Sequence, residues 1–338
     1  MENQREVELK AWVETATGYT QGPLQTVSGD ASFRRYFRGT DGNQSVIAVD
    51  APPQQEPIKP FVEVAEAYAA AGVPVPEVLA VNEKRGFMLL SDLGSTLLLS
   101  KLSEHNMQAY YQQALQLLPN IMRVTRTAGG PLPAYDEALL RRELALFSDW
   151  LLARHLGLEL SEAELQLWAS FCQLMVDNAL AQPQVGVHRD YHARNIMVLD
   201  DESLATIDFQ DAVCGPISYD VVSLLRDCYV AWPREQVEQL AQYARQLLQA
   251  EQLLPAQLSA QQWQHQFDWM GLQRHTKAAG IFARLYHRDG KDGYLNDIPR
   301  TLRYLQQVAS LYPQLADYHD WLVTRVLPAW QQRLRASA

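Results

Sequence analysis

The amino-acid sequence predicts an α+β fold in two lobes, a small antiparallel sheet with one inserted helix followed by a larger, mainly helical part. Runs of β-branched and aromatic residues separated by turn residues dominate the beginning of the chain. After about residue 93 the apolar residues recur with helical spacing instead. We therefore expect an N-terminal domain over 1–93 and a C-terminal domain over 94–338, since 338 residues favour about two domains.

Composition and charge describe an ordinary globular protein and exclude several classes of function. Hydrophobic residues make up 47% of the chain and charged residues 20%, which is typical of a folded core. The net charge of -10 argues against nucleic acid as a partner, because phosphate backbones bind to basic surfaces. The sequence shows no signal-peptide pattern and no apolar run of about 18 residues, and its three scattered cysteines favour a reducing compartment. We expect a cytoplasmic protein with no membrane contact and no obligate protein partner.

The first predicted elements follow from periodicity and from turn residues. A helix is expected over 5–16, where one stripe is apolar. This stripe consists of Val7, Leu9, Trp12, Val13 and Ala16. Residues 24–38 and 45–50 predict three antiparallel strands, with turns at 28–32 and 39–43.

A second helix and two further strands complete the predicted sheet. The helix spans 57–72, because prolines open this segment and a glycine closes it. Strands are expected at 78–81 and 87–90, joined by a polar turn. From 103 to 181 and from 218 to 335 the apolar spacing predicts helices and no strands.

The most informative stretch is His188-Arg189-Asp190-Tyr191-His192-Ala193-Arg194-Asn195, followed by Ile207-Asp208-Phe209. Between these stretches two short apolar runs flank a polar turn, which predicts a β-hairpin. Such a hairpin brings Asn195 and Asp208 back to the same end. Either motif alone is often only a turn or a strand end, but the full set with its hairpin is far more specific.

This spacing matches the needs of phosphoryl transfer from a nucleotide. The reaction requires a carboxylate that orients the attacking hydroxyl and accepts its proton, a role that suits Asp190. It also requires oxygen ligands for Mg²⁺, which takes few protein ligands and leaves its other positions to water and phosphate. Asp190 is therefore the predicted catalytic residue, and Asn195 and Asp208 are the predicted metal ligands.

The turn between the first two strands is the candidate phosphate-binding element. It reads Ser28-Gly29-Asp30-Ala31-Ser32 and is rich in small residues, so backbone N–H groups there are able to approach phosphate. The predicted nucleotide contacts are Gly29, Asp30 and Ser32, with Arg34 just beyond them. An ordinary hairpin loop explains the same residues equally well.

Three motifs of this chain occur together in one known family. They are His188-x-Asp190-x-His192-x-x-Asn195, Ile207-Asp208-Phe209 and Gly215-Pro216-x-x-Tyr219-Asp220. In these motifs the chain resembles the aminoglycoside phosphotransferase family, which has a bilobal protein-kinase-like fold and uses ATP and Mg²⁺ to phosphorylate small molecules. Within that family it is most similar to the bacterial kinases that phosphorylate the anomeric hydroxyl of N-acetylmuramate and N-acetylglucosamine in peptidoglycan recycling. The narrower likeness lies in the stretches 29–38, 47–53 and 273–285.

The resemblance also implies roles for residues outside the two loops. The backbone of Ser91, Asp92 and Leu93 would meet the adenine as the hinge between the lobes. Asp220 would brace the catalytic loop, although a helix N-cap is an equally good interpretation. Only a short loop precedes Asp220, whereas protein kinases order a long activation segment against a peptide substrate. A protein substrate is therefore not expected.

One departure from the kinase pattern concerns the third strand. Protein kinases carry a lysine there that contacts the α- and β-phosphates, whereas this chain has Asp50. Either Asp50 has another role, or a cation from elsewhere neutralises the phosphates. Arg34 and Arg38 alternate onto one face of the second strand and Arg35 onto the other. Any of these three arginines is a candidate, and a solvated strand face is the equally good alternative.

The same departure leaves the usual partner of that lysine open. Glu63 and Glu66 lie three positions apart on the second predicted helix and therefore share one side. Whichever of them faces inward is the candidate partner of a phosphate-binding cation.

The substrate side is expected among the later helices. Arg274, His275 and Lys277 form a local basic group in an otherwise acidic chain. Such a group suits an anionic substituent, for example the lactyl carboxylate of muramate, but a solvated helix face explains it nearly as well. Glu143, on a helix expected over 139–152, is a further candidate that would bond sugar hydroxyls.

Together these features favour an ATP-dependent kinase of N-acetylmuramate, N-acetylglucosamine or both. Within enzymes, the alternative is a kinase of an aminoglycoside or another small alcohol. Outside enzymes, the missing lysine suggests a nucleotide-binding pseudokinase that acts as a regulatory module. The presence of Asp190, Asn195 and Asp208 weighs against the pseudokinase.

Overall fold

The computed structural model describes residues 4–17, 24–27, 33–41 and 44–337. Its contacts divide the chain into two compact units. The first unit consists of 1–104, 123–132 and 188–212, and the second of 105–122, 133–187 and 213–338. The catalytic and metal loops thus group with the sheet, while the boundary at about residue 93 stays a prediction. Among the described residues no helix is long and apolar enough to cross a membrane.

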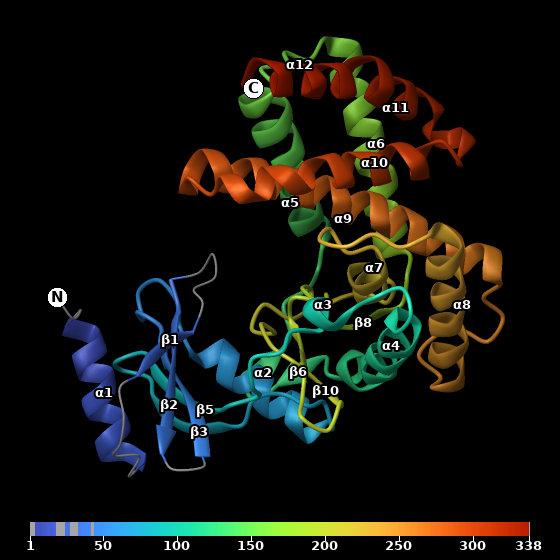
Figure 1. Ribbon diagram of the computed structural model, residues 1–338. Helices are drawn as coiled ribbons and strands as arrows, with labels where there is room; N and C mark the ends of the chain where they lie inside the picture. Colours follow the sequence, from blue (N-terminus) through green and yellow to red (C-terminus); the bar gives the residue numbers. More distant parts are fainter. Residues whose placement is uncertain (1–3, 18–23, 28–32, 42–43, 338) are drawn as a thin grey trace. The chain divides into compact units, whose positions relative to one another are not determined.

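The first unit contains a five-stranded antiparallel sheet in the order β1-β2-β3-β5-β4 (Figure 1). The strands are β1 (Gln25–Val27), β2 (Arg35–Asp41), β3 (Gln44–Asp50), β4 (Val78–Asn82) and β5 (Phe87–Ser91). Every neighbouring pair is antiparallel. The five predicted strands and the α+β class are therefore confirmed.

Helix α1 (Gln4–Thr17) packs on one face of this sheet (Figure 1). Leu9, Trp12 and Val13 are buried against apolar side chains of the sheet. These partners are Phe37, Val46, Ala48, Phe87 and Leu89. The predicted stripe is wrong at Val7, which is 50% exposed, because the face of α1 that meets the sheet is narrower than the run of apolar residues.

Helix α2 (Lys59–Ala70) follows the sheet's third strand and confirms the second predicted helix. Pro60 occupies its first turn, where a missing N–H costs nothing. Its buried side chains are Phe61, Val64, Ala65 and Tyr68. Gly72 has a φ of 75°, the left-handed conformation that glycine adopts most easily after a helix.

Two hairpins complete the first unit together with the short helix α3 (Leu98–Lys101). Strands β9 (Ile196–Val198) and β10 (Leu204–Thr206) pair antiparallel and confirm the predicted hairpin. Strands β6 (Arg126–Thr127) and β7 (Gly130–Pro131) also pair. The expectation of helices alone between 103 and 181 is therefore wrong here, since two-residue strands are too short to leave an alternating pattern.

The second unit is mainly helical, with one strand pair. Its α-helices are α4 (Met107–Arg123), α5 (Glu137–Leu146), α6 (Glu162–Leu180), α7 (Tyr219–Leu225), α8 (Arg234–Ala250), α9 (Ala260–Asp289), α10 (Ile298–Ala309), α11 (Ala316–Trp321) and α12 (Leu327–Ser337). A π-helix, η1 (Phe147–His155), continues α5. Strands β8 (Gln184–Val187) and β11 (Val213–Pro216) pair antiparallel.

Helix α9 is the central element of the second unit, since it packs against α5, α6, α7, α8 and α10 (Figure 1). Ser259 and Gln262 form a capping box at its start, and Gly290 ends it with a φ of 67°. Gly280 lies where α9 crosses the end of α5, and a Cβ there would come within 2.3 Å of the carbonyl carbon of Leu146. The close approach of these two helices therefore requires glycine at this position.

Candidate active site

The hairpin of β9 and β10 brings the predicted metal ligands together. The amide nitrogen Nδ2 of Asn195 lies 3.3 Å from Oδ2 of Asp208. The same nitrogen donates to the backbone oxygen of Asp190 at 3.0 Å, and Gln210 donates to the other oxygen of Asp208 at 2.8 Å. Three residues predicted from spacing alone are thus linked through one amide group.

Two residues of these loops have backbones in the left-handed region. Arg189 has a φ of 81° and Asp208 a φ of 64°. Such a conformation is uncommon for residues with a Cβ and costs on the order of 1 kcal/mol or more. Arg189 directly precedes the predicted catalytic residue, and Asp208 is a predicted metal ligand. Strained backbone is often found at functional sites, where the surrounding contacts hold it in place.

His188 anchors the catalytic loop from within the core. Its ring is fully buried, and Nε2 lies 2.7 Å from the hydroxyl of Thr206 on β10. Burial lowers the pKa of His188 to about 4, although the nearby carboxylate of Asp190 opposes this shift. A neutral imidazole therefore holds the start of the catalytic loop against strand β10, which precedes Asp208.

Helix α2 packs directly on the metal loop. The ring of Phe209 lies 4.8 Å from that of Phe61 and 5.6 Å from that of Tyr68, measured between centroids. These contacts fix the residue after Asp208 against a helix of the same unit. The roles of Phe61, Tyr68, Thr206 and Gln210 were not predicted from the sequence. Of these four, only Gln210 lies close in sequence to a predicted site residue, two positions after Asp208.

The predicted phosphate-binding turn lies outside the described residues, so Gly29, Asp30 and Ser32 stay predictions. Arg34, which follows this turn, is buried and forms an ion pair with Glu56 at 3.2 Å. Its guanidinium also lies 6.0 Å from the ring centroid of Phe61. The nucleotide contact expected of Arg34 stays a prediction.

Asp50 replaces the strand lysine of protein kinases and is fully buried. One carboxylate oxygen accepts from Arg5 of α1 at 2.5 Å and the other from Arg35 of β2 at 2.5 Å. Asp50 therefore tethers α1 to the sheet, which is the other role left open by the sequence. Arg5 was missed because nothing in the spacing connects residues that lie 45 positions apart.

The predicted hinge begins where β5 ends. The N–H of Ser91 donates to the oxygen of Glu77 at 2.9 Å, so this residue still belongs to the sheet. The carboxylate of Asp92 accepts from Arg38 at 2.6 Å and from the N–H of Gly94 at 2.9 Å, and from Ser45. Burial opposes ionisation of Asp92, but these hydrogen bonds outweigh it and lower its pKa. A nucleotide contact at Leu93 and its neighbours stays a prediction.

The two glutamates of α2 differ in their surroundings. Glu63 lies 3.7 Å from Lys59 and accepts from the hydroxyl of Thr127 at 3.3 Å. Glu66 is exposed. Glu63 is therefore the inward-facing member of the pair, and it meets the β6–β7 hairpin rather than a residue of β3.

A second polar cluster lies among the helices of the second unit. Lys277 of α9 forms an ion pair with Glu143 of α5 at 2.9 Å and donates to the hydroxyl of Tyr219 of α7 at 3.0 Å. Glu143 is buried and also accepts from Tyr135 and, at 3.2 Å, from Gln273. Two predicted substrate residues, Glu143 and Lys277, are thus bonded to each other.

The other two predicted substrate residues differ sharply from each other. The guanidinium of Arg274 lies 4.8 Å from the ring centroid of Tyr219, and its side chain is partly exposed. His275 is fully buried, stacks on Tyr304 at 4.4 Å and lies 2.9 Å from the oxygen of Arg226. Burial lowers the pKa of His275 to about 3. His275 is a neutral core residue, and a direct substrate contact does not fit this position.

Asp220, expected to brace the catalytic loop or to cap a helix, lies in the first turn of α7. The N-cap of α7 is Ser218, so the capping interpretation is wrong. Asp220 is 1% exposed, and its bracing role stays a prediction.

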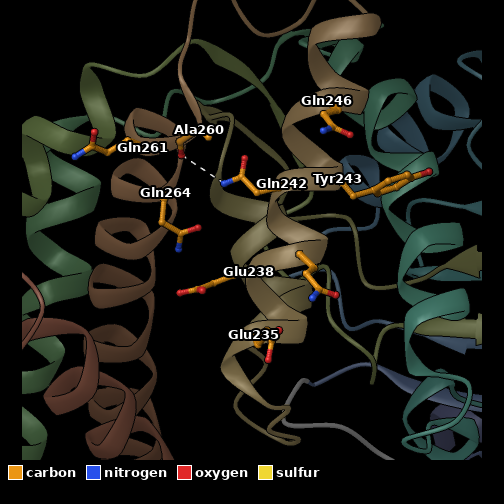
Figure 2. Close-up of a pocket in the computed structure, with 9 residues that line it drawn as sticks. Glu235, Glu238, Gln242, Tyr243, Gln246, Ala260, Gln261 and Gln264 are labelled. Atoms are coloured by element: carbon orange, nitrogen blue, oxygen red, sulfur yellow. Dashed lines mark hydrogen bonds between the residues drawn. The ribbon is translucent and has the colours of Figure 1, made fainter.

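A hollow in the second unit lies between α8 and the start of α9 (Figure 2). Glutamine side chains dominate its lining, together with Glu235, Glu238 and Tyr243. Figure 2 shows Glu238 and Gln264 between the two helices, with Gln242 donating to the oxygen of Ala260. None of the residues predicted for catalysis, metal or substrate lines this hollow, so it is distinct from the candidate site.

Comparisons with known proteins establish the family. The sequence profile of the phosphotransferase enzyme family matches residues 23–266. An N-acetylmuramate/N-acetylglucosamine kinase of Pseudomonas aeruginosa is 45% identical over 328 residues, which cover 94% of this chain and 96% of that protein. A kinase of the same name from Neisseria meningitidis serogroup B is 40% identical and covers 96% of each chain. The chain belongs to the phosphotransferase enzyme family, and the predicted resemblance is confirmed.

Solved structures support the fold at much lower identity. The ADP-bound aminoglycoside phosphotransferase APH(2'')-Ib superimposes with a TM-score of 0.61 at 14% identity, covering 89% of this chain and 98% of that chain. An ethanolamine kinase of Plasmodium vivax gives a TM-score of 0.65 at 10% identity, covering 94% and 92%. The protein-kinase-like fold is therefore confirmed, and the chain is a phosphotransferase of that fold.

Proposed function

We propose that this phosphotransferase uses ATP and Mg²⁺ to phosphorylate the anomeric hydroxyl of N-acetylmuramate, N-acetylglucosamine or both. The observation that carries the proposal is the juxtaposition of Asp190, Asn195 and Asp208 in a chain 45% identical to a kinase of that name. The reaction would serve peptidoglycan recycling in the cytoplasm.

Asp190 is the proposed base. Its carboxylate would orient the C1 hydroxyl toward the γ-phosphate and accept the proton of that hydroxyl late in the transfer. An anomeric hydroxyl is more acidic than an ordinary alcohol, so orientation is the larger part of this role. His188 is neutral and buried, and its bond to Thr206 would keep the loop in place.

The residues present fit a magnesium ion. A carboxylate from Asp208 and an amide from Asn195 lie within 3.3 Å of each other, and both offer the hard oxygen atoms that Mg²⁺ prefers. When bound, Mg²⁺ would offset the negative charge of the nucleotide phosphates. Asp208 and Asn195 would hold the ion, and the bond from Gln210 to Asp208 would orient the carboxylate.

The test is a transfer assay with ATP and magnesium chloride over N-acetylmuramate, N-acetylglucosamine and an aminoglycoside. We expect ADP release with either sugar and a product that no longer reacts as a reducing sugar, because phosphate at C1 blocks the aldehyde. Transfer to the aminoglycoside alone would contradict the sugar assignment. ATP binding without transfer to any acceptor would indicate a nucleotide-binding regulatory module instead.

A further inference from the structure

We infer that Asp92, held by Arg38 and Ser45, is a positioning residue that keeps the catalytic hairpin at a fixed place beside the sheet during phosphoryl transfer. The catalytic hairpin is 188–208, which holds the catalytic loop, β9, β10 and Asp208. The connecting segment is 92–99, which runs from the end of β5 into α3. All of these residues belong to the first unit. The inference rests on the proposed function.

The carboxylate of Asp92 holds the connecting segment to two strands of the sheet. Its two oxygens accept from Nε and Nη2 of Arg38 on β2, at 2.6 and 3.0 Å, which is the geometry of a bidentate pair. The hydroxyl of Ser45 on β3 donates to the same carboxylate. The side chain of Asp92 is only 6% exposed, so these bonds are largely shielded from water. We call Asp92, Arg38 and Ser45 the carboxylate clamp.

The carboxylate clamp also fixes the backbone just after Asp92. The N–H of Gly94 donates to Oδ1 of Asp92 at 2.9 Å, and the carbonyl oxygen of Gly94 accepts from Arg38 at 2.7 Å. Gly94 has a φ of 85°, and a glycine has more backbone conformations available than any other residue. The two bonds therefore select one direction for the chain at the point where it is most able to turn.

The other end of the connecting segment pairs with the catalytic hairpin. The N–H of Val198 on β9 donates to the oxygen of Thr96 at 2.8 Å. Leu97 forms an antiparallel bridge with Met197, also on β9. The connecting segment thus lies beside β9 as a short third strand, four residues or fewer after the clamp residue Asp92.

One more bond links the connecting segment to the catalytic loop itself. The N–H of Leu99 on α3 donates to the oxygen of Ala193 at 2.9 Å. Ala193 lies between Asp190 and Asn195 in the sequence. A continuous path of hydrogen bonds therefore leads from the sheet through the carboxylate clamp to the loop that carries the predicted base and a predicted metal ligand.

This path bears on the reaction because phosphoryl transfer depends mainly on positioning. The predicted nucleotide contacts lie on the side of the sheet, whereas Asp190, Asn195 and Asp208 belong to the catalytic hairpin. A misplacement of about 1 Å between reacting groups costs about 100-fold in rate. The contacts of Phe209 with α2 hold the far end of the hairpin, so loss of the clamp shifts the hairpin without releasing it.

The test follows kcat and backbone hydrogen exchange in purified full-length Asp92→Asn, at a temperature where the variant is fully folded. The amide replaces one acceptor oxygen with a donor, so the bidentate pair with Arg38 is lost. We expect kcat at saturating ATP, magnesium chloride and sugar to fall about tenfold. Exchange should become faster in 92–101 and 193–199 and stay at the wild-type rate in 59–70.

The matched control is Asp201→Asn in the turn between β9 and β10. This carboxylate is exposed and accepts only from Ser203 among the bonds described for it, so the change removes an equal charge from the same hairpin without touching the clamp. It should leave kcat and the exchange of 92–101 at the wild-type values. Ser45→Ala removes a single bond from Asp92 and should cause the same changes as Asp92→Asn to a smaller extent. It decides the matter if Asp92→Asn does not fold.

The outcomes separate a positioning role from the alternatives. An increase in KM for ATP with unchanged kcat would assign Asp92 to nucleotide binding alone and overturn the inference. Faster exchange over the whole first unit, with unchanged kcat, would show a role in stability alone and overturn it as well. Both results leave the proposed function standing. Wild-type protein that transfers phosphate to no acceptor overturns the proposed function, and the exchange of 193–199 then decides by itself whether Asp92 holds the hairpin.

Discussion

The loops of the first unit and the helical cluster of the second unit hold their polar groups in different ways. Asp190, Asn195 and Asp208 lie on short loops around one hairpin, and their links include backbone atoms and a neutral amide. Glu143 and Lys277 lie on long helices and neutralise each other inside the unit. The loops present carboxylate and amide oxygen atoms, whereas the ion pair on the helices holds the aromatic ring of Tyr219 in place.

This difference separates two kinds of functional residue. A loop residue that performs chemistry tolerates almost no change, because the group itself takes part in the reaction. A residue of a buried ion pair acts through the packing that it maintains, so its loss is felt first in the free energy of unfolding. Variants in each region should therefore affect different measurements.

The largest effect is expected for Asp190→Asn in the catalytic loop. The amide retains the shape of the carboxylate but cannot accept the proton of the sugar hydroxyl, so kcat should fall about 1,000-fold. The affinity for ATP, measured by calorimetry, should stay close to the wild-type value. The matched control is Asp211→Asn, which removes an exposed carboxylate from the same unit and should retain activity. Wild-type turnover in Asp190→Asn would remove this residue from its role.

The next effect is expected for Glu143→Gln in the helical cluster. This change removes the carboxylate charge beside the ammonium of Lys277, which is only 12% exposed, so the free energy of unfolding should fall by about 3 kcal/mol. The double variant with Lys277→Met should regain part of that loss, because it removes the ammonium charge as well. Urea denaturation of the four proteins of this cycle measures both values. Equal stability of the single and double variants would show that the ion pair is not the origin of the loss.

A smaller effect is expected for Asp50→Asn on β3. An amide cannot satisfy both Arg5 and Arg35, but these arginines are about one third exposed and can turn to water. We expect a loss of about 2 kcal/mol in the free energy of unfolding. Asp50→Lys introduces the lysine that protein kinases carry at this position of the third strand. It also places a third cation beside two arginines, so it should destabilise the protein further. Tighter ATP binding in Asp50→Lys would contradict the role assigned to Asp50.

The sequence predicts the two regions unequally, for physical reasons. The loop residues are recognisable because the reaction fixes their types and the hairpin fixes their spacing, so Asn195 and Asp208 could be paired in advance. The basic residues on α9 are similar in type, but the structure places them in different surroundings. His275 is a core residue and Lys277 is neutralised by Glu143 from a separate helix, and one-dimensional spacing does not record such contacts. Arg5 was missed for the same reason.

One property is shared by both regions, a pH dependence of stability, and its effect at neutral pH is the smallest of those expected here. Each region buries a neutral imidazole, and burial lowers the pKa of His188 to about 4 and that of His275 to about 3, from a usual value of 6.5. Below pH 6.5 these two imidazoles bind protons in the unfolded chain but stay neutral in the folded protein. The free energy of unfolding should therefore be highest above pH 6.5 and fall as the pH drops toward 4. His275→Phe keeps a ring against Tyr304 and removes one such proton, which should reduce the slope in this window by about 1.4 kcal/mol per pH unit. Denaturation by urea at several pH values, followed by tryptophan fluorescence, measures the slope. Parallel curves for the variant and the wild type would mean that the imidazole of His275 gains a proton in the folded protein as readily as in the unfolded chain.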